Sequence, residues 1–323
     1  TNQGECYFEV RDCVVGYWTT KGVKEIIKIL VGGMEMNDYN ELSKKIDFPY
    51  EAAEIVEKIH KQILSDSDFL QKYTVVRERF FKGEDTLADV KTLAAEKNIE
   101  PLTLALAFTV LYSSTMRSIY CERGISEDIY YDSLRDLTIR SRETKRELGV
   151  WGMKGYDWIT DQLRCEMFRL GRLQYQFRQF ACDSFSKGGY TVRKGDAVLN
   201  IHIPEGESLS REKCLDSYCR ACKFFGCNVF VCSSWLLYPC HEEFLPKTSN
   251  ILDFMHDFTI IKSDEIEGAG DMWRIFGRRE KYIPSELPRD TSLRSAYADW
   301  YEKTGKTGKG YGVFFFDGEN IVK

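Results

Sequence analysis

The sequence predicts an α+β protein, with an all-helical N-terminal domain followed by a mixed α/β domain. The chain has 323 residues, which is more than one hydrophobic core usually organises. Up to about Gly149, apolar residues recur at three- and four-residue spacing, as in amphipathic helices, and strand patterns are almost absent. After Gly149, period-two stretches alternate with helical stretches, which is typical of a mixed α/β layer with antiparallel edges. We therefore expect domains over residues 1–148 and 149–323.

Four helices are expected in the first domain. Tyr50–Leu64 places its apolar residues on one face, and Pro101–Tyr120 is apolar nearly all round, as a central helix would be. The longest apolar stretch of Pro101–Tyr120 is Leu102–Tyr112. It is shorter than the roughly 18 apolar residues of a membrane span, so we expect a buried core helix. The other two are Thr86–Glu96 and Asp128–Leu148.

The second domain is expected to contain alternating strands and helices around a turn at Gly188–Gly189. The expected helices are Tyr156–Leu170, Ser210–Phe225 and Tyr238–Leu245. The expected strands are Arg172–Phe180, Ala197–Pro204, Asn228–Trp235, Phe258–Lys262, Trp273–Phe276 and Val313–Phe316.

Composition narrows the class of protein. The formal net charge is −5, which argues against a nucleic-acid or anionic-membrane binder, because both need a positive surface. The aromatic share of 14% favours a large core and pockets for flat or acyl-chain ligands. Eleven cysteines without regular spacing indicate reduced thiols, and Thr1–Val10 has neither the basic nor the apolar region of a signal peptide. We expect a cytoplasmic protein.

A cysteine cluster raises the alternative of a structural zinc protein. Its one short-spaced pair, Cys219 and Cys222, lies within a helical pattern and lacks the usual knuckle glycine. We therefore expect buried thiols and no metal. The cluster, beside His241, comprises Cys214, Cys219, Cys222, Cys227, Cys232 and Cys240.

Two glycine-rich segments share features with phosphate-binding loops. Gly305–Gly310 has Trp300 where a P-loop needs glycine, and a strand rather than a helix follows it, so we expect a flexible basic loop able to touch a ligand phosphate. Glu265–Gly270 lies between two expected strands, which predicts a hairpin loop.

A strand, turn and helix start at residues 197–210 carry the clearest candidate site. Asn200 and His202 share one face of the strand, while Leu199, Ile201 and Ile203 share the other. Pro204 ends the strand, Gly206 permits a tight turn, and Ser208 or Ser210 can cap the next helix. This arrangement binds a diphosphate through free N–H groups, although Glu205 and Glu207 would repel an anion. The alternative is that His202 is a structural histidine.

The end of the following strand supplies a second set of polar groups. Ser233 and Ser234 are candidate cleft residues beside Trp235, and Tyr238 stands at a helix start. No G-x-S-x-G elbow surrounds either serine, so a Ser–His–Asp hydrolase is not expected. The two strand ends are predicted to face one site.

Several of these runs together resemble a known family. They are Phe168–Phe177 (FRLGRLQYQF), Val198–Gly206 (VLNIHIPEG), Ser234–Leu237 (SWLL) and Ser249–Ile251 (SNI). Over essentially the whole chain, the sequence resembles a bacterial two-domain family with an N-acyltransferase N-terminal helical domain and a GNAT-like C-terminal domain.

The resemblance implies a GNAT-like mixed α/β domain with a central, largely antiparallel sheet over about Val150–Lys323. In such folds two central parallel strands splay, and the pantetheine arm of acyl-CoA lies between them. Ala197–Pro204 and Asn228–Trp235 would be these strands, with the diphosphate over the next turn. The turn departs from the usual R/Q-x-x-G-x-G/A loop. The implied acyl-CoA-binding residues are Ile203, Gly206, Glu207, Ser208, Leu209 and Ser210.

We therefore expect acyl transfer from acyl-CoA, as a co-substrate, to an amine or similar acceptor by direct attack. His202, or Glu205 through a water, is the candidate base, and a backbone N–H near Val231–Ser233 would polarise the thioester carbonyl. Tyr238 is the candidate acid, because GNAT enzymes commonly place a tyrosine there. The expected substrate-cleft residues are Asn200, Ser233, Ser234 and Trp235.

The alternative is a non-catalytic small-molecule-binding or sensing protein with a GNAT-like cleft, which the acidic turn favours. In both cases the expected partner is a small molecule, with no nucleic acid, membrane or metal. The acceptor, the acyl-chain length and the oligomeric state do not follow from the sequence.

Overall fold

The computed structural model describes residues 36–322, which form two compact units that divide after Leu170. The boundary expected at residues 148 and 149 coincides with the end of one long helix of the first unit. The expectation for Thr1–Val10 lies outside the described residues. Each unit is considered by itself.

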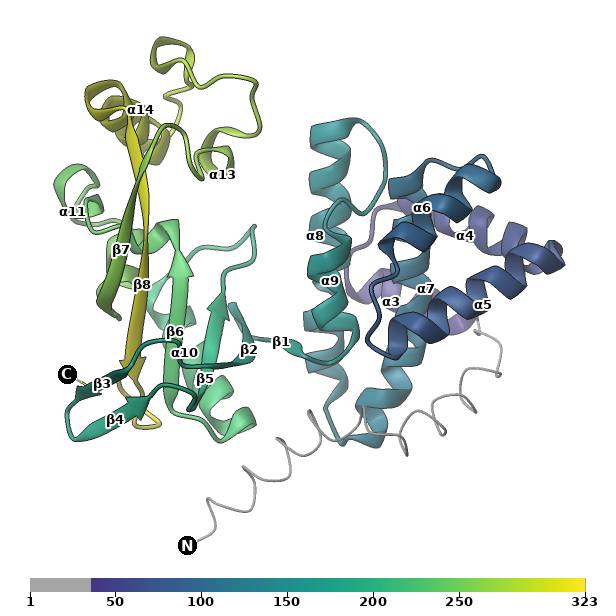
Figure 1. Ribbon diagram of the computed structural model, residues 1–323, viewed down its shortest axis with the longest axis horizontal. Coiled ribbons are helices and arrows are strands. Elements are labelled where there is room, and N and C mark those ends of the chain that lie inside the picture. The colour runs from purple at the N-terminus through teal and green to yellow at the C-terminus, as the bar shows by residue number, and fades with distance from the viewer. Residues whose placement is uncertain (1–35, 323) are drawn as a thin grey trace, which may run out of the picture. The chain divides into compact units, whose positions relative to one another are not determined.

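The described part of the first unit is helical until its last residues (Figure 1). The four helices expected there are confirmed to within two residues at each end. Its elements are α3 (Met36–Lys45), α4 (Tyr50–Ser65), α5 (Ser67–Phe81), α6 (Leu87–Glu96), α7 (Pro101–Glu122), α8 (Glu127–Leu148), α9 (Tyr156–Leu163) and β1 (Met167–Leu170).

Helix α7 is the core of this unit. It contacts α3, α4, α6, α8 and α9, and Phe108 and Tyr112 pack against aromatic rings of α5. Its length and apolar composition would suffice to cross a membrane, but 76% of its apolar stretch is buried inside the protein. The prediction of a buried core helix is therefore confirmed.

The helix expected over Tyr156–Leu170 is correct only in its first half. Helix α9 ends at Leu163, and β1 follows it. Cys165 adopts a left-handed backbone conformation with φ of 58°, which a helix cannot continue through.

In the sheet of the second unit, the strands lie in the order β2-β5-β6-β8-β7. The β5–β6 pair is parallel, whereas the β2–β5, β6–β8 and β7–β8 pairs are antiparallel. The fold class is thus as expected, a helical domain followed by a mixed α/β domain with a largely antiparallel sheet. The strands are β2 (Leu173–Gln179), β3 (Ser184–Lys187), β4 (Tyr190–Arg193), β5 (Ala197–His202), β6 (Val229–Ser234), β7 (Thr259–Glu267) and β8 (Lys306–Phe315).

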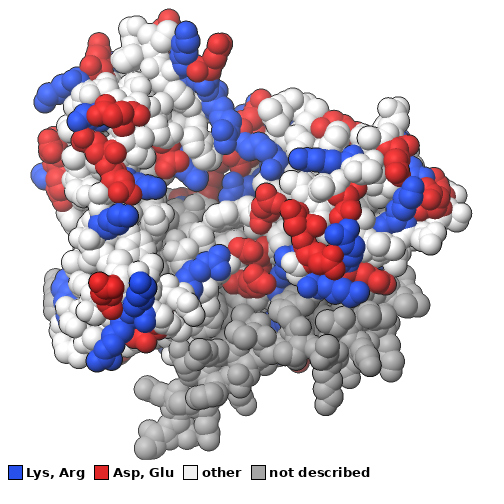
Figure 2. All heavy atoms as spheres, viewed as in Figure 1, with Lys and Arg blue, Asp and Glu red and all other residues white. Residues whose placement is uncertain are grey.

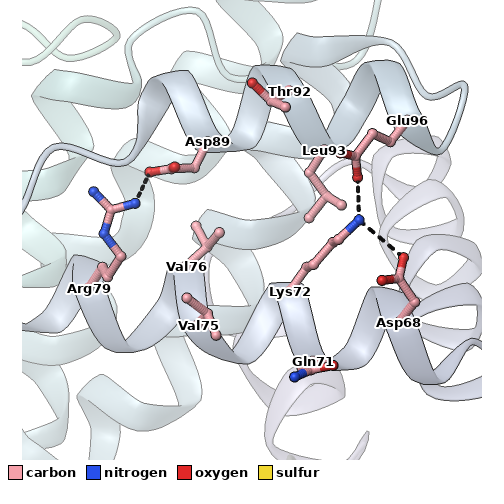
Figure 3. A pocket seen from close by; sticks show the side chains of 10 residues that line it. All are labelled: Asp68, Gln71, Lys72, Val75, Val76, Arg79, Asp89, Thr92, Leu93 and Glu96. Atoms are coloured by element: carbon pink, nitrogen blue, oxygen red, sulfur yellow. Dashed lines mark hydrogen bonds and ion pairs between the residues drawn. The ribbon is translucent and has the colours of Figure 1, made fainter.

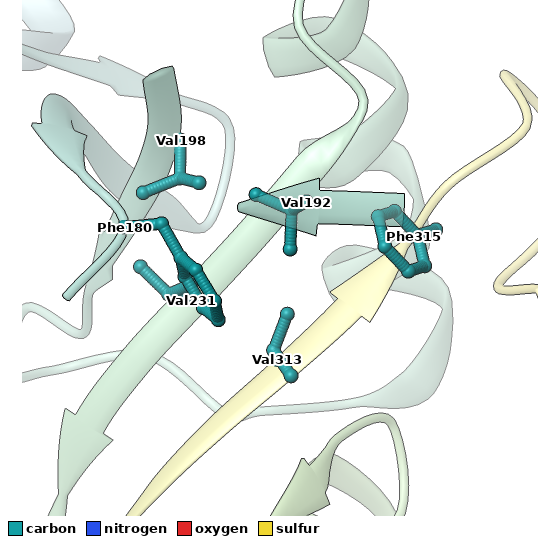
Figure 4. Packing of buried hydrophobic residues seen from close by; sticks show 6 residues of the cluster. All are labelled: Phe180, Val192, Val198, Val231, Val313 and Phe315. Carbon is teal, nitrogen blue, oxygen red and sulfur yellow. The ribbon is translucent and has the colours of Figure 1, made fainter. Parts of the chain in front are cut away.

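The two faces of this sheet have different covers. On one face, Tyr218 of α10 (Arg211–Phe225) packs 5.7 Å from Phe230 and 4.9 Å from Phe314, measured between ring centroids. On the other, the β3–β4 hairpin covers the beginnings of β5 and β6 (Figure 4). This second core comprises Phe180, Val192, Val198, Val231, Val313 and Phe315.

The loop expected at Gly305–Gly310 was a wrong prediction, because β8 runs from Lys306 through this segment. A Cβ on Gly308 would overlap the ring of Tyr238, and one on Gly310 would overlap the carbonyl oxygen of Leu237. The glycines are therefore strand residues that let another segment pack directly on the backbone. Their lack of side chains hides the strand pattern.

Three further expectations are corrected. Trp273–Phe276 is a helix, α13, rather than a strand, and its Ile275 and Phe276 are buried. Glu265–Gly270 is not a tight hairpin, because residues 268–305 intervene before β8 returns beside β7. The helix expected at Tyr238–Leu245 begins only at His241. The remaining elements are η1 (Trp235–Leu237), α11 (His241–Phe244), α12 (Asn250–Met255), η2 (Pro284–Glu286) and α14 (Ser292–Thr304).

Candidate active site

Strands β5 and β6 pair only over a short stretch. Their parallel ladder consists of two residue pairs, Leu199 with Phe230 and Asn200 with Val231. Beyond it, β5 continues to His202 in register with β2, and β6 continues to Ser234 in register with β8 (Figure 1). The carboxyl ends of these adjacent strands therefore pair outward and not with each other. Their facing backbone groups have no ladder partner across the gap.

Polar side chains lie on one face of the sheet beside this gap. The Nε2 atom of His202 lies 3.0 Å from Nδ2 of Asn200 and 3.3 Å from Oε1 of Gln176. Leu199 and Ile201 are buried on the opposite face. The structure thus brings Asn200 and His202 together as their spacing predicts, and adds Gln176 from the neighbouring strand.

Strand β2 contributes a second buried amide. Gln174 pairs in register with His202, and Gln176 pairs with Asn200. Both glutamines are at most 2% exposed, and Nε2 of Gln174 has no hydrogen-bond partner. Sequence reasoning did not assign Gln176 to the site. Polar residues at alternate positions of an otherwise apolar strand were the available signal.

The turn after β5 leads directly to the N-terminus of α10. Gly206 has φ of 108°, a conformation that favours glycine, and Glu205 to Ser208 are exposed. Leu209 and Ser210 are half-buried, and the side chain of Ser210 makes no capping hydrogen bond. The first N–H groups of this 15-residue helix are therefore not occupied by a capping side chain.

Arg172 and Lys213 change the electrostatics of this turn. The guanidinium of Arg172, which is 5% exposed, donates from Nε to the carbonyl oxygen of Ser208 at 3.1 Å. It also donates from Nη2 to the carbonyl oxygen of Glu207 at 2.7 Å. Lys213 Nζ lies 3.0 Å from Oε2 of Glu207. The turn's carbonyls are thus held by a cation, and the carboxylate of Glu207 is paired with Lys213. Sequence reasoning missed Arg172, because the contact depends on the tertiary structure.

Two side chains further along the chain fix the start of α10. Asn250 Nδ2 donates to Oγ of Ser208 at 3.0 Å. Asp257 is buried, pairs with Arg211 and accepts a hydrogen bond from the hydroxyl of Tyr218 at 2.9 Å. The turn is consequently held in place before any ligand binds.

The residues predicted at the end of β6 divide into two groups. Ser233 is exposed and alternates onto the same face as Val231, whereas Ser234 Oγ accepts from the N–H of Leu236 at 3.2 Å and caps η1. Trp235 lies 5.7 Å from the ring of Tyr297. Ser233 therefore faces the polar side of the sheet, and Ser234 supports η1.

Tyr238 lies elsewhere. It covers Gly308 of β8, across β6 from β5, and its hydroxyl is 3.5 Å from Oε2 of Glu265. Burial, followed by the neighbouring Cys240 and Glu265, raises its pKa above the usual value of a phenol. The structure does not bring Tyr238 together with His202.

The cysteine cluster is only partly buried, because Cys214, Cys227 and Cys232 are buried whereas Cys219, Cys222 and Cys240 are half-buried. Within residues 36–322, the cysteines are free and no group of three or more His, Cys, Asp or Glu side chains could hold a metal ion. Burial raises the pKa of Cys232 to about 12 and of Cys227 to about 11, so both thiols stay protonated at neutral pH.

Charged side chains of the described residues also surround a groove in the first unit. On the face drawn in Figure 2, acidic and basic side chains are interspersed. A groove of about 420 Å³ between α5 and α6 is bounded by ion pairs, Lys72 with Asp68 and Glu96 at one end and Arg79 with Asp89 at the other (Figure 3). Its cations are already neutralised, and its floor is apolar.

Comparisons with known proteins agree with this fold. The family model described as "N-acyltransferase N-terminal domain" matches residues 37–165, and that described as "GNAT-like C-terminal domain" matches residues 167–314. Among curated proteins, none matches the chain.

Solved structures share the fold. An acyltransferase in complex with decanoyl-CoA and teicoplanin is 23% identical, with 86% of this chain and 87% of that chain covered and a TM-score of 0.64. An acyltransferase in complex with CoA and 10C-teicoplanin is 22% identical, with 85% and 86% covered and a TM-score of 0.66. An acyltransferase mutant in complex with octanoyl-CoA is 22% identical, with 87% and 88% covered and a TM-score of 0.65.

Proposed function

Because the chain belongs to the two-domain N-acyltransferase family, we propose that it transfers an acyl group from acyl-CoA to an amine or similar group of a small molecule. The observation that carries this proposal is the separation of β5 and β6 after two residue pairs. His202 lies at the end of β5, beside this gap, and the turn before α10 follows it. The solved relatives that contain acyl-CoA or CoA, two of them with teicoplanin or its derivative, support this donor and acceptor class.

The residues present fit acyl-CoA. Two strand edges that lack ladder partners suit the amides of a pantetheine arm. The N-terminus of α10 suits a diphosphate, because its N–H groups and helix dipole favour anions. Pairing of Glu207 with Lys213 and the proximity of Arg172 reduce the repulsion that the acidic turn would otherwise exert. Ile203, Gly206 and Ser208 to Ser210 would line this part of the site.

His202 is the proposed base, and Glu205 acting through a water is the alternative. The acceptor nitrogen forms a C–N bond to the thioester carbonyl carbon, the C–S bond breaks, and the nitrogen's proton passes to the base. A backbone N–H in the stretch Val231–Ser233 would stabilise the charge on the carbonyl oxygen. Asn200, Ser233 and Trp235 remain the proposed cleft residues.

The leaving thiolate needs a proton, for which Tyr238 is the donor predicted from the sequence. Its raised pKa keeps the phenol protonated at neutral pH. To reach a thiolate between β5 and β6, however, its hydroxyl would have to leave Glu265. Loss of activity in Tyr238→Phe, with folding intact, would support this role, and retained activity would assign Tyr238 to packing on Gly308.

A charge placed at the start of α10 tests the binding mode. We expect CoA, octanoyl-CoA and decanoyl-CoA to raise the melting temperature in a saturable manner, since a ligand at about 100 times its Kd stabilises by roughly 2.7 kcal/mol. Ser210→Asp should abolish this shift by repelling the diphosphate. Ser210→Asn is the matched control, because asparagine has the same shape, caps equally well and carries no charge. It should retain the shift.

No shift with any of these ligands would overturn the acyltransferase proposal. The alternative expected from the sequence, a small-molecule-binding or sensing protein with a GNAT-like cleft, would then take its place. A shift retained by Ser210→Asp would leave acyl-CoA binding intact but place the diphosphate elsewhere.

A further inference from the structure

Two side-chain amides meet one ring nitrogen of His202. The nearer contact to Nε2 is the Nδ2 donor of Asn200 at 3.0 Å, and the other is the Oε1 acceptor of Gln176 at 3.3 Å. One nitrogen thus faces both a hydrogen-bond donor and a hydrogen-bond acceptor.

These partners suit different protonation states of the ring. A neutral imidazole with its lone pair on Nε2 accepts a hydrogen bond there, whereas the imidazolium donates from both nitrogens, and the neutral tautomer with its proton on Nε2 also donates from Nε2. Nδ2 of Asn200 can serve only the first state, and Oε1 of Gln176 can serve only a protonated Nε2.

We propose that Asn200 and Gln176 are positioning residues that serve the two protonation states of His202, with Asn200 donating to the neutral ring and Gln176 accepting from Nε2–H. A general base must hold a proton during the reaction and release it afterwards. A donor and an acceptor already in place would let His202 alternate between both states with little movement. The role in catalysis rests on the proposed function, whereas the hydrogen bonding of the two amides to His202 does not.

The sheet holds both amides in place. Gln176 and Asn200 are in register across β2 and β5, and Gln176 is only 2% exposed. Water therefore competes little for Gln176, and a hydrogen bond to a charged group is stronger than one between neutral groups. On this face of β2, β5 and β6, alternation places one further charged side chain, Arg178, opposite Val198. Both amides that lie at hydrogen-bond distance from Nε2, those of Asn200 and Gln176, are neutral.

The two amides are expected to shift the titration midpoint of His202 in opposite directions. Gln176→Met removes the acceptor for the protonated ring, so it should lower the titration midpoint of His202. Asn200→Leu removes the donor to the neutral ring, so it should raise that midpoint. We expect each shift to be about one pH unit, the size of one hydrogen bond to a half-buried titratable group.

NMR can follow this titration in the complete chain. With only 4 histidines in the sequence, selective labelling with ¹³C and ¹⁵N gives a simple ring spectrum, and His202→Gln assigns the signal. His241 is an internal reference for folding. It is buried, its Nε2 is bonded to the hydroxyl of Tyr297, and burial lowers its pKa to about 4. It should stay neutral above about pH 5 in every folded variant.

Two further variants test whether a shift in the midpoint of His202 could arise from misfolding. Gln176→Glu keeps an acceptor of the same shape and adds negative charge, so it should raise the midpoint of His202. Gln174→Met is the matched control, because Gln174 lies directly opposite His202 but its amide nitrogen has no hydrogen-bond partner. It should move the midpoint by less than about 0.3 pH unit.

Shifts of the same sign in Gln176→Met and Asn200→Leu, or no shift in either, would overturn the inference. The titration requires neither acyl-CoA nor an acceptor, so it is independent of the proposed reaction. If the opposite shifts appear but His202→Gln retains acyl transfer, the role of His202 as base fails and the amide arrangement stands. If His202→Gln loses activity without opposite shifts in the amide variants, only the amide arrangement fails.

Discussion

Strand β6 has two edges with very different pairing. Along β8 it is in register over all six of its residues, from Val229 opposite Phe315 to Ser234 opposite Gly310. Along β5 it is in register at Phe230 and Val231 only. Since one strand forms both edges, strand propensity cannot explain the difference. The gap must be imposed by the neighbours that hold each strand end.

Each strand end is held from outside the gap. The end of β5 is paired with β2, and the turn that follows is bonded to Arg172 and Asn250. The end of β6 is paired with β8, and Leu237 of η1 packs on Gly310 of that strand. We call the β8 side of β6 the closed edge and the β5 side the open edge. Packing of η1 on β8 maintains the closed edge, whereas hydrogen bonds from Arg172 and Asn250 to the turn after β5 maintain the open edge. The predictions below test each edge.

The largest effect is expected from Gly310→Ala, which attacks the closed edge. The new methyl group would overlap the carbonyl oxygen of Leu237, so β8 and η1 would have to separate. We expect a loss of about 4 kcal/mol in the free energy of unfolding, measured by urea denaturation. Gly155→Ala is the control, since its Cβ would meet no atom nearer than 3.5 Å, and it should cost less than about 1 kcal/mol. Equal losses in both variants would contradict the packing account.

An intermediate effect on the free energy of unfolding is expected from lowering the pH, through His241 beside η1. His241 is buried beside η1, and burial lowers its pKa from 6.5 to about 4. The unfolded chain therefore binds this proton more readily than the folded protein does. The stability that this residue contributes is complete above pH 6.5 and is lost as the pH falls toward 4.

Between about pH 7.5 and pH 5, His241 should account for a decrease of about 2 kcal/mol in the free energy of unfolding. His241→Gln, which cannot titrate, should lose less stability than the wild type over the same interval. Parallel urea denaturation of both proteins at the two pH values gives the comparison. An identical decrease would mean that the burial of His241 does not govern the acid response.

The smallest effect is expected at the open edge, from Lys213→Met. The Lys213–Glu207 pair is exposed, so its loss should change the free energy of unfolding by less than about 0.5 kcal/mol. It frees a carboxylate beside the proposed diphosphate site, and CoA affinity should fall about threefold at low salt and less at high salt. Adding Glu207→Gln should restore the affinity in a CoA titration. A double variant that binds as weakly as Lys213→Met would separate Glu207 from the site.

The sequence pattern predicted much of this arrangement. Amphipathic spacing located the helices α4, α6, α7 and α8, and alternation located β2, β5 and β6 to within two residues. Alternation also placed Asn200 and His202 on one face. The glycines of β8 were misread, because a residue without a side chain adds nothing to a hydrophobic pattern.

The partners of the site residues could not be predicted in the same way. Gln176 meets His202 only because β2 pairs with β5 in one register, and Arg172 meets Glu207 and Ser208 only because the chain returns beside it. Tyr238 was expected near His202, since both follow strand ends, but the structure places it across β6. These contacts depend on strand order, which local patterns do not contain.

By itself, the sequence determined where the backbone forms helices and strands and which face of each is apolar, because these follow from local spacing. Only the tertiary structure decided which strand edge remains unpaired. Both edges of β6 present the same kinds of backbone donor and acceptor, from alternate residues, so nothing local distinguishes them. Segments distant in the sequence decide which edge stays unpaired: β8 pairs with one side of β6, and the turn after β5 is held away from the other side. The unpaired edge forms the candidate active site.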